Sequence, residues 1–536
     1  MIDHSLARLV FIRTCIFLLQ NAPWIEAFLF LTLPLVLPTS HIWFRALSGT
    51  LAALLLAETA FAVFIYLPHK TRLKRLAEYP PPLTSEEREA LFERCVANIP
   101  NLERYLQVWF LGTDISEIKR DNVRDFLLWA FFERDGGGPA SYVDEETSFS
   151  HEEELEGYIC RVEAILGWQL PPGRGAATPL RLTIDPIFIR YHSVIWYAII
   201  GLVDLATHTV LRFHGFAYHS PAVRTSSTFP PTPALRAVPL PGVSRRVSPS
   251  SSLAYWHRPH SSTTHLPVVF IHGIGIGLWP YASFFADLNP SSSGDNQIGI
   301  IALEILPISA RLTAPPLTRP AFIAQLNAIL AAHSPDWKRF VLVSHSYGSV
   351  LTTHILRDSL LGPRVEAAVL VDPVSILLHL PDVAYNFTRR PPRRANEWQL
   401  WYFASMDAGV AEGLGRHFFW RENIIWREEL VAVSGNGEEV QGATKKRKVA
   451  VSLAGRDLIV DTRTVARYLA TEGDFSKVPE EDVFPVHIHQ NHLTPSGVEI
   501  LWFPGLDHAQ VFEKRSHRER VVEVVRRYCL VDDALI

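Results

Sequence analysis

Residues 339–356 read RFVLVSHSYGSVLTTHIL. An apolar run typical of a buried strand leads into a tight turn at Ser346, and a helical pattern follows directly. Such a turn holds a serine out from the sheet, and it requires small residues two positions before and two positions after it. Those positions hold Ser344 and Gly348, so the stretch departs from the usual GxSxG only at Ser344. The pattern predicts an exposed nucleophilic serine between a strand and a helix.

Short apolar runs and helical patterns alternate from about residue 251 onward. The expected strands are Leu266–Ile271, Ile298–Ile305, Phe340–Val343, Ala367–Val371, Val449–Leu453 and Val498–Phe503. The clearest helices between and after them are Tyr347–Arg357, Thr462–Ala470 and Arg518–Tyr528. Continuous apolar strands separated by helices predict an α/β fold, with a mostly parallel sheet covered by helices on both faces.

A glycine-rich turn, HGIGIG, follows the first of these strands. A loop in this place can donate one backbone N–H to a developing oxyanion, beside the N–H of the residue after the nucleophile. We therefore expect Ile274 and Tyr347 to form the oxyanion hole. A phosphate-binding turn is the weaker alternative, because GIGIG lacks the GxGxxG spacing of dinucleotide-binding proteins.

Two more positions fit hydrolytic chemistry. His508 follows the last strand, where it can act on Ser346 as a general base. Asp457 follows the preceding strand, where a carboxylate can orient the imidazole and stabilise its cationic form. Asp372, in VLVDPV, is the rival acid. Asp461 is the better N-cap for the helix that follows, which leaves Asp457 free for this role and favours it over Asp372.

These motifs resemble the α/β-hydrolase superfamily over about residues 251–536. The resemblance implies a Ser346–His508–Asp457 triad and a two-step mechanism through an acyl-enzyme, with no metal or organic cofactor. More loosely, the whole chain looks like the membrane-anchored fungal hydrolases that have a long helical N-terminal region.

The N-terminal region predicts a membrane anchor. Residues 47–67 read LSGTLAALLLAETAFAVFIYL, about the ~20 residues that a spanning helix needs, with Glu58 as the only charge. The basic residues Lys70, Arg72, Lys74 and Arg75 follow directly. By the positive-inside rule, this flank and the catalytic domain after it are expected in the cytosol.

Two other apolar stretches are less regular. Thr14–Pro38 is interrupted by polar residues and prolines, and it predicts either a first spanning helix, forming a hairpin, or an interfacial segment. Ser193–Leu211 contains Asp204 and His208, which favours a buried or membrane-surface helix over a third span. The organelle stays open, with the endoplasmic reticulum and lipid droplets as candidate membranes.

The expected organisation has four parts. Residues 1–75 form the anchor, 76–216 a helical region, 217–250 a Pro- and Ser-rich linker, and 251–536 the catalytic domain with a cap at about 374–440. The helical region carries no recognisable chemistry, and its expected role is structural or covering. Aromatic residues alternate with arginines in the cap, which suits a lid over an apolar substrate, a membrane interface or an ordinary packed cap.

The predicted function is hydrolysis of a carboxylic ester of a lipid or other apolar acyl substrate at a membrane. A thioesterase or acyltransferase using the same residues, and a catalytically silent scaffold, are the alternatives. The net charge of −4 gives no support for nucleic-acid binding. The four cysteines, Cys15, Cys95, Cys160 and Cys529, are far apart and indicate neither a zinc site nor a disulfide framework.

Overall fold

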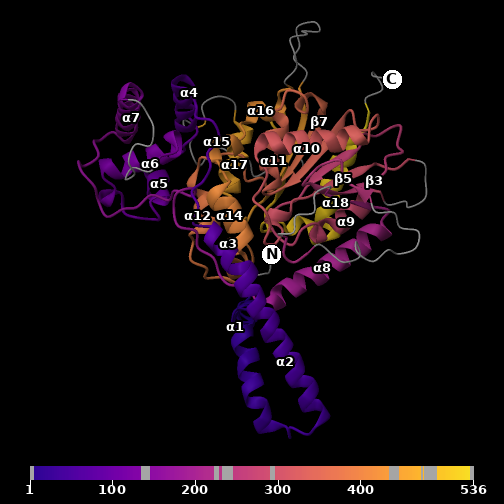
Figure 1. The fold of residues 1–536 in the computed structure, drawn as a ribbon. Helices are drawn as coiled ribbons and strands as arrows, with labels where there is room; N and C mark the ends of the chain where they lie inside the picture. The colour runs from indigo at the N-terminus through magenta and orange to yellow at the C-terminus, as the bar shows by residue number, and fades with distance from the viewer. Residues whose placement is uncertain are drawn as a thin grey trace.

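A computed structural model shows a central mixed sheet with helices on both faces and a helical hairpin projecting from one end (Figure 1). It describes residues 5–134, 145–221, 228–231, 246–289, 296–433, 446–471, 475 and 492–531. Parts of the expected linker, 222–227 and 232–245, and of the expected cap, 434–440, lie outside these residues.

The sheet has ten strands in the described residues, in the order β2-β1-β3-β5-β4-β6-β7-β8-β10-β9. Strands β5, β4, β6, β7, β8 and β10 are mutually parallel, which confirms the predicted fold class. The strand bounds are β1 (Ala217–Ser220), β2 (Arg246–Val247), β3 (Ala254–Arg258), β4 (Val268–Ile271), β5 (Ile300–Glu304), β6 (Phe340–His345), β7 (Val365–Val371), β8 (Lys448–Ala454), β9 (His492–Leu493) and β10 (Val498–Phe503).

Alternate residues of the strands enter two separate cores. In β4, Val269 and Ile271 point into one core, and Val268 and Phe270 point into the other. The first core contains α10 (Arg319–Ala332), α11 (Gly348–Leu356) and α17 (Thr462–Ala470). The second contains α9 (Ala282–Leu288) and α18 (Arg515–Cys529). Because both faces are covered, the central strands are apolar throughout, which is why they were visible in the sequence.

The expected linker extends this sheet at its edge. β1 pairs with β3 in antiparallel orientation, and β2 pairs with β1. The sheet therefore begins before residue 251. The sequence does not reveal these strands, because segments of four and two residues are too short for a periodic pattern.

The cap lies between β7 and β8 and is helical. Its elements are α12 (Pro381–Thr388), α13 (Ala395–Leu400), η7 (Trp401–Ser405), α14 (Ala408–Arg416), α15 (Trp420–Asn423) and α16 (Arg427–Val431). Short helical turns elsewhere are η2 (Ile115–Glu117), η4 (Trp279–Tyr281), η5 (Leu306–Ile308), η6 (Gly362–Arg364) and η9 (Gln510–Phe512).

The helical region packs against the cap. It contains α4 (Ser85–Val96), α5 (Leu102–Trp109), α6 (Arg120–Phe132) and α7 (Glu145–Leu166). A capping box of Thr84 and Glu87 begins α4. Arg421 of the cap pairs with Glu133 at 2.7 Å, and the Trp420 indole donates to the Ala130 carbonyl at 3.0 Å. The apolar core of this region is continuous with the first core of the sheet.

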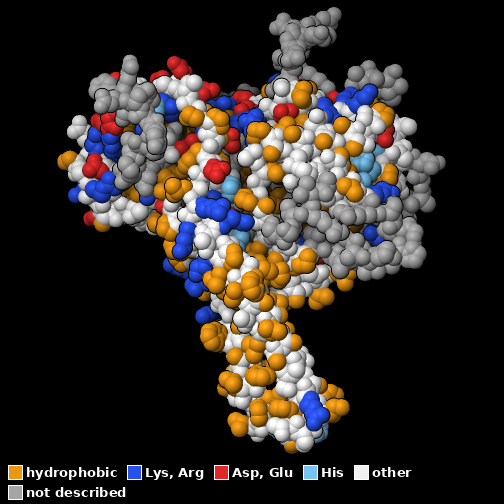
Figure 2. Space-filling view, in the orientation of Figure 1, with side chains coloured by type: hydrophobic (Ala, Val, Ile, Leu, Met, Phe, Trp, Pro, Cys, Tyr) orange, Lys and Arg blue, Asp and Glu red, His pale blue; other side chains and the backbone are white. Residues whose placement is uncertain are grey.

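Two long helices, α1 (Leu6–Val36) and α2 (Ile42–Phe61), form the projecting hairpin. α2 continues through η1 (Ala62–Tyr66) into α3 (Leu67–Arg72). α1, the continuous helix Ile42–Arg72 and α8 (Val194–Phe213) are each long and apolar enough to cross a membrane. Apolar side chains cover most of the visible hairpin surface (Figure 2).

α8 joins the hairpin to the body. Glu58 of α2 accepts hydrogen bonds from the Tyr191 hydroxyl at 2.5 Å and from the Val194 N–H at 2.9 Å, at the start of α8. Further along, Asp204 forms a buried ion pair with Arg311. Glu58 and Asp204, the acidic residues within these two apolar helices, therefore bind other parts of the protein.

Candidate active site

Ser346 occupies the sharp turn between β6 and α11. Its φ of +51° lies in the left-handed region, as a strained strand-to-helix turn requires. A Cβ at Gly348 would come within 2.5 Å of the Ile271 carbonyl oxygen, so only glycine fits there. A Cβ at Gly273 would meet the Ser346 Cβ at 2.8 Å. Ser344 is 1% exposed at the end of β6, and the turn therefore accommodates its side chain where the usual motif has glycine.

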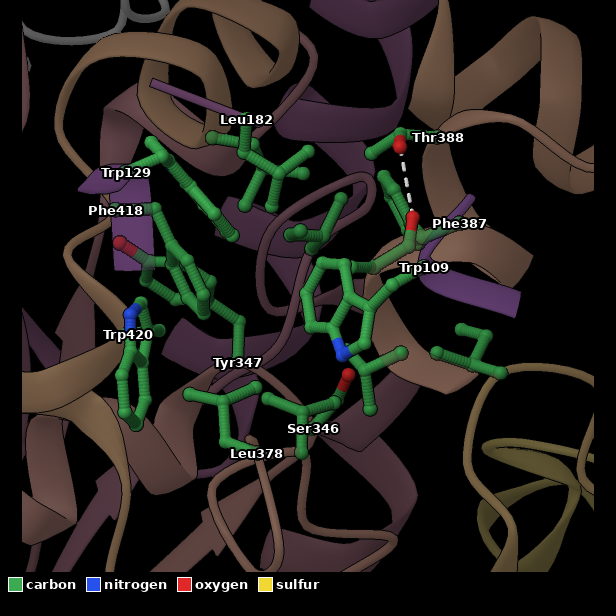
Figure 3. Close-up of a pocket in the computed structure, with 16 residues that line it drawn as sticks. Trp109, Trp129, Leu182, Ser346, Tyr347, Leu378, Phe387, Thr388, Phe418 and Trp420 are labelled. Atoms are coloured by element: carbon green, nitrogen blue, oxygen red, sulfur yellow. Dashed lines mark hydrogen bonds between the residues drawn. The ribbon is translucent and has the colours of Figure 1, made fainter. Parts of the chain in front are cut away.

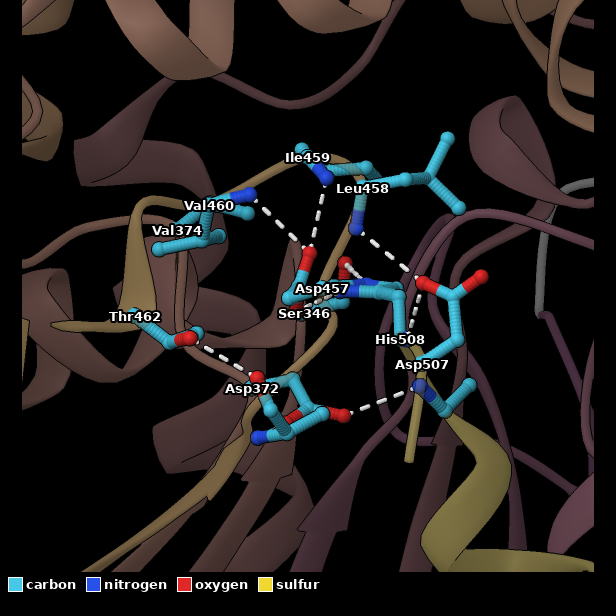
Figure 4. A network of polar contacts seen from close by, with 12 residues as sticks. Ser346, Asp372, Val374, Asp457, Leu458, Ile459, Val460, Thr462, Asp507 and His508 are labelled. Carbon is cyan, nitrogen blue, oxygen red and sulfur yellow. Dashed lines mark hydrogen bonds and ion pairs between the residues drawn. The ribbon is translucent and has the colours of Figure 1, made fainter. Parts of the chain in front are cut away.

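Ser346, His508 and Asp457 form one hydrogen-bonded chain. His508 Nε2 lies 2.9 Å from Ser346 Oγ, and His508 Nδ1 lies 2.7 Å from Asp457 Oδ2. The second oxygen of Asp457 accepts from the backbone N–H groups of Ile459 and Val460, at 2.8 and 2.9 Å. The three predicted residues thus come together, each from a loop that follows a parallel strand (Figure 4).

The charge of Asp457 controls the imidazole. Burial lowers the pKa of His508, but the Asp457 carboxylate, with smaller contributions from Asp372 and Asp507, outweighs burial and raises this pKa to about 9. The proton that His508 takes up is therefore held more firmly than in free histidine.

Asp372, the rival acid, has a different position. One of its oxygens accepts from the Ala454 N–H at 3.0 Å, and the other accepts from the Ala509 N–H at 2.9 Å. Burial raises the pKa of Asp372 to about 7. Its hydrogen bonds tie the end of β8 to the residue after His508. Asp372 therefore fixes the backbone next to His508, whereas Asp457 contacts the His508 ring.

Two other histidines lie beside the site but are not part of its hydrogen-bonded series. His272 accepts from the Ile305 N–H at 2.9 Å, and His345 Nδ1 lies 2.7 Å from the Tyr281 hydroxyl. Burial lowers the pKa of His272 to about 4 and the pKa of His345 well below its ordinary value. Burial therefore favours the neutral form of both rings beside His508.

The hydrogen bonds of the His508 ring disfavour metal binding at the serine site. Ligand atoms of Asp372, Asp457 and His508 lie within 4.8 Å of one another. Both ring nitrogens of His508 are already engaged, by Ser346 and by Asp457. The geometry suits proton transfer between these groups.

An apolar pocket opens beside Ser346. Ile274 and Tyr347, the expected oxyanion-hole residues, line it together with the serine. Aromatic and aliphatic side chains form the rest of its wall (Figure 3): Trp109, Trp129, Leu182, Val374, Leu378, Val383, Ala384, Phe387, Thr388, Leu414, Phe418, Trp420 and Ile459. The Thr388 hydroxyl donates to the Ala384 carbonyl at 2.7 Å, so it is turned toward its own helix.

Part of this wall was not predicted. Trp109 of α5, Trp129 of α6 and Leu182 come from the helical region in which the sequence indicated no chemistry. No local signal marks them, because the pocket exists only once this region packs over the cap. Phe418 and Trp420 of the cap line the same pocket, as a lid over an apolar substrate would require.

The aromatic residues of the cap contribute to two surfaces, the wall of the pocket and the contact with α1. Phe418 and Trp420 face the pocket, whereas Trp398, Trp401 and Tyr402 pack against α1. The Arg13 guanidinium lies 5.3 Å from the centre of the Trp398 ring. The cap therefore connects the pocket to the hairpin.

Comparison with known protein families agrees with the predicted fold. Residues 268–524 match the alpha/beta hydrolase family. This part of the chain belongs to the α/β-hydrolase family. Among solved structures, the chain is similar to a membrane phospholipase A described as a bacterial virulence factor, at 14% identity and a TM-score of 0.32, over 62% of this chain and 94% of that chain. It is also similar to naproxen esterase from Bacillus subtilis, at 14% identity and a TM-score of 0.33, over 61% and 98% of the two chains. No curated protein matches it significantly in sequence.

The pKa of His508 gives a prediction that does not depend on substrate. In the detergent-solubilised protein with labelled histidines, we expect the His508 ring signals to titrate near pH 9, assigned by their loss in His508→Gln. In Asp457→Asn the main charge that raises this pKa is gone and burial remains, so the midpoint should move to lower pH. An unchanged midpoint in Asp457→Asn would contradict the assignment of Asp457 as the partner of His508.

Proposed function

We propose that this protein is a membrane-anchored serine hydrolase that cleaves carboxylic esters of lipids or other apolar acyl compounds through an acyl-enzyme. The observation that carries the proposal is the chain from Ser346 through His508 to Asp457, which ends in an apolar pocket. A nucleophile, a base and an orienting acid in hydrogen-bond contact are the parts that acyl transfer needs.

In the first step, Ser346 Oγ attacks the ester carbonyl carbon while the unprotonated His508 ring, which a pKa of about 9 favours at alkaline pH, takes the hydroxyl proton at Nε2. The carbonyl oxygen becomes an oxyanion, for which the backbone N–H groups of Ile274 and Tyr347 are the proposed donors. α11 begins at Gly348, directly after Tyr347, so its positive end also favours the negative charge there. His508 then gives its proton to the leaving alcohol, and the acyl group stays on Ser346.

In the second step, His508 removes a proton from a water molecule, which attacks the acyl carbonyl. The tetrahedral intermediate collapses, the carboxylic acid leaves, and the proton returns to Ser346 Oγ. Thioesters and transfer to an alcohol would use the same acyl-enzyme, so the proposal concerns the acyl group more than the leaving group.

The pocket supports an apolar acyl group. Its wall is almost entirely aromatic and aliphatic, and the hydroxyl of Thr388 is satisfied by the Ala384 carbonyl. A polar or charged acyl chain would lose its water contacts there, and the Trp109 indole N–H, which is unpaired within the described residues, could replace few of them. A hydrocarbon chain gains about 25 cal/mol for each Å² removed from water.

The attachment of the cap to the hairpin supports a substrate that comes from a membrane. Ile12 and Ile16 of α1 pack against Ala395 and Tyr402 of the cap. Arg72, in the basic flank after α2, forms an ion pair with Glu412 of α14. We place this flank and the catalytic domain in the cytosol and α8 at the membrane surface. The pocket is then held close to the bilayer by direct side-chain contacts.

Labelling with a fluorophosphonate probe tests the serine chemistry. In sealed microsomes, the 60.5 kDa chain should label, and Ser346→Ala should not. Ser344→Gly, a matched control two residues away that restores the usual motif, should label like the wild type. A folded wild type that stays unlabelled would contradict the enzyme and favour the silent scaffold. Protease added outside the vesicles should remove the label if the domain is cytosolic, and protection would overturn only that placement.

A substitution in the pocket tests the acyl site. Val383 of α12 lines the pocket, and Val383→Phe fills part of it. We expect kcat/KM for a long-chain ester to fall by about tenfold or more, as removal of space for a few methylenes implies, with little change for an acetate ester. Tyr385→Phe on the same helix is the control. Equal losses for both esters would mean that the acyl chain does not occupy this pocket.

A further inference from the structure

Three histidines far apart in the chain meet at one edge of the sheet. His219 lies on β1, His257 on β3, and His333 directly after α10. The ring centres of His257 and His333 are 3.9 Å apart, and that of His219 is 6.0 and 5.5 Å from these two. One nitrogen of each ring lies within 4.8 Å of the others. In the sheet order, β5 and β4 separate this cluster from β6, which carries the serine turn.

Tyr255 holds two of the three rings, those of His219 and His333. Its hydroxyl lies 3.0 Å from His219 Nδ1 and 2.9 Å from His333 Nε2. These contacts leave the opposite nitrogen of each ring for another partner. Histidines that bind metals are oriented in the same manner, with the other ring nitrogen donating to a neighbouring oxygen. One phenol oxygen can accept from both rings.

Three ring nitrogens of the cluster have no hydrogen-bond partner within the described residues. His219 Nε2 and both nitrogens of His257 are buried without a hydrogen bond from any residue that the structure describes. Each of these two residues is 8% exposed. Leaving a buried polar atom unpaired costs about 1–3 kcal/mol, so three such atoms in one place need an explanation.

We propose that His219, His257 and His333 bind a divalent transition-metal ion of the zinc type, with water as the fourth ligand. Three imidazoles and an open position are a known ligand set for zinc, at Zn–N distances of about 2.0–2.1 Å. Nitrogens around such an ion are roughly 3.4 Å apart, so the rings would have to rotate to bring the nitrogens that do not contact Tyr255 onto one ion. Without carboxylate or thiolate ligands, the set suits zinc and similar metals rather than calcium or magnesium.

The electrostatic setting agrees with neutral ligands. Burial, followed by the neighbouring ring and Arg246, lowers the pKa of His219 to about 4 and that of His257 to about 3. Both rings are therefore unprotonated at pH 7, as metal ligation requires. Arg246 on β2 opposes a dication, but its side chain is exposed and water screens its charge.

The site would fasten the edge of the sheet. β1 follows α8 directly, so an ion that joins β1 to β3 and α10 would tie the membrane-facing helix to the catalytic domain. This role does not depend on the proposed ester hydrolysis.

Zinc titration of the full-length protein tests the site. Metal is removed with a chelator, and Zn²⁺ is added in competition with a chromophoric chelator. We expect one tightly bound ion per chain. His257→Gln should abolish this binding, Tyr255→Phe should weaken it roughly 10–100-fold, and Arg246→Gln should tighten it. His265→Gln, a partly exposed histidine outside the cluster, and His508→Gln should bind zinc like the wild type.

Two measurements distinguish loss of the metal site from misfolding of a variant. Fluorophosphonate labelling of Ser346 reports whether His257→Gln keeps its catalytic domain, and circular dichroism serves if no variant labels. X-ray absorption of the zinc-loaded wild type should show three imidazole nitrogens at about 2.0 Å. Wild type that binds no zinc, a folded His257→Gln that binds it unchanged, or binding that is lost in His508→Gln would overturn the proposal.

Discussion

The hydrogen bond between Asp457 and His508 is the interaction on which the active-site arrangement depends. Burial alone would lower the pKa of His508, yet this pKa lies near 9, above the ordinary 6.5. The difference corresponds to about 3 kcal/mol in favour of the protonated ring. An imidazole that accepts the serine proton therefore finds its positive charge stabilised in a site largely closed to water. Asp372 and Asp507 contribute to the same field while they fix the surrounding loops through backbone N–H groups.

Other parts of the chain enclose the hydrogen bond between Asp457 and His508. The sheet presents the serine, acid and histidine at the ends of parallel strands, and the cap and the helical region close over them with aromatic side chains. The cap in turn packs on the hairpin, so the cap links the apolar pocket to the apolar hairpin through side-chain contacts.

The sequence predicts the parts that depend on local pattern. Strands β4 to β8 and β10 are buried on both faces and read as apolar runs, and Ser346, Asp457 and His508 each follow one of them. Other features depend on packing between distant segments. Trp109 and Trp129 carry no mark of a pocket, β1 and β2 are too short for a pattern, and the cluster of His219, His257 and His333 is assembled only by the pairing of β1 with β3.

The central claim is that Ser346 carries the acyl group during turnover. Rapid acid quenching of the protein with a long-chain ester, followed by mass spectrometry of its peptides, measures this directly. The account predicts an acyl mass on the peptide that contains Ser346, present at short times and lost as the ester is consumed. Cleavage of the ester with no acyl group on Ser346 at any time, or with the group on another residue, would contradict it.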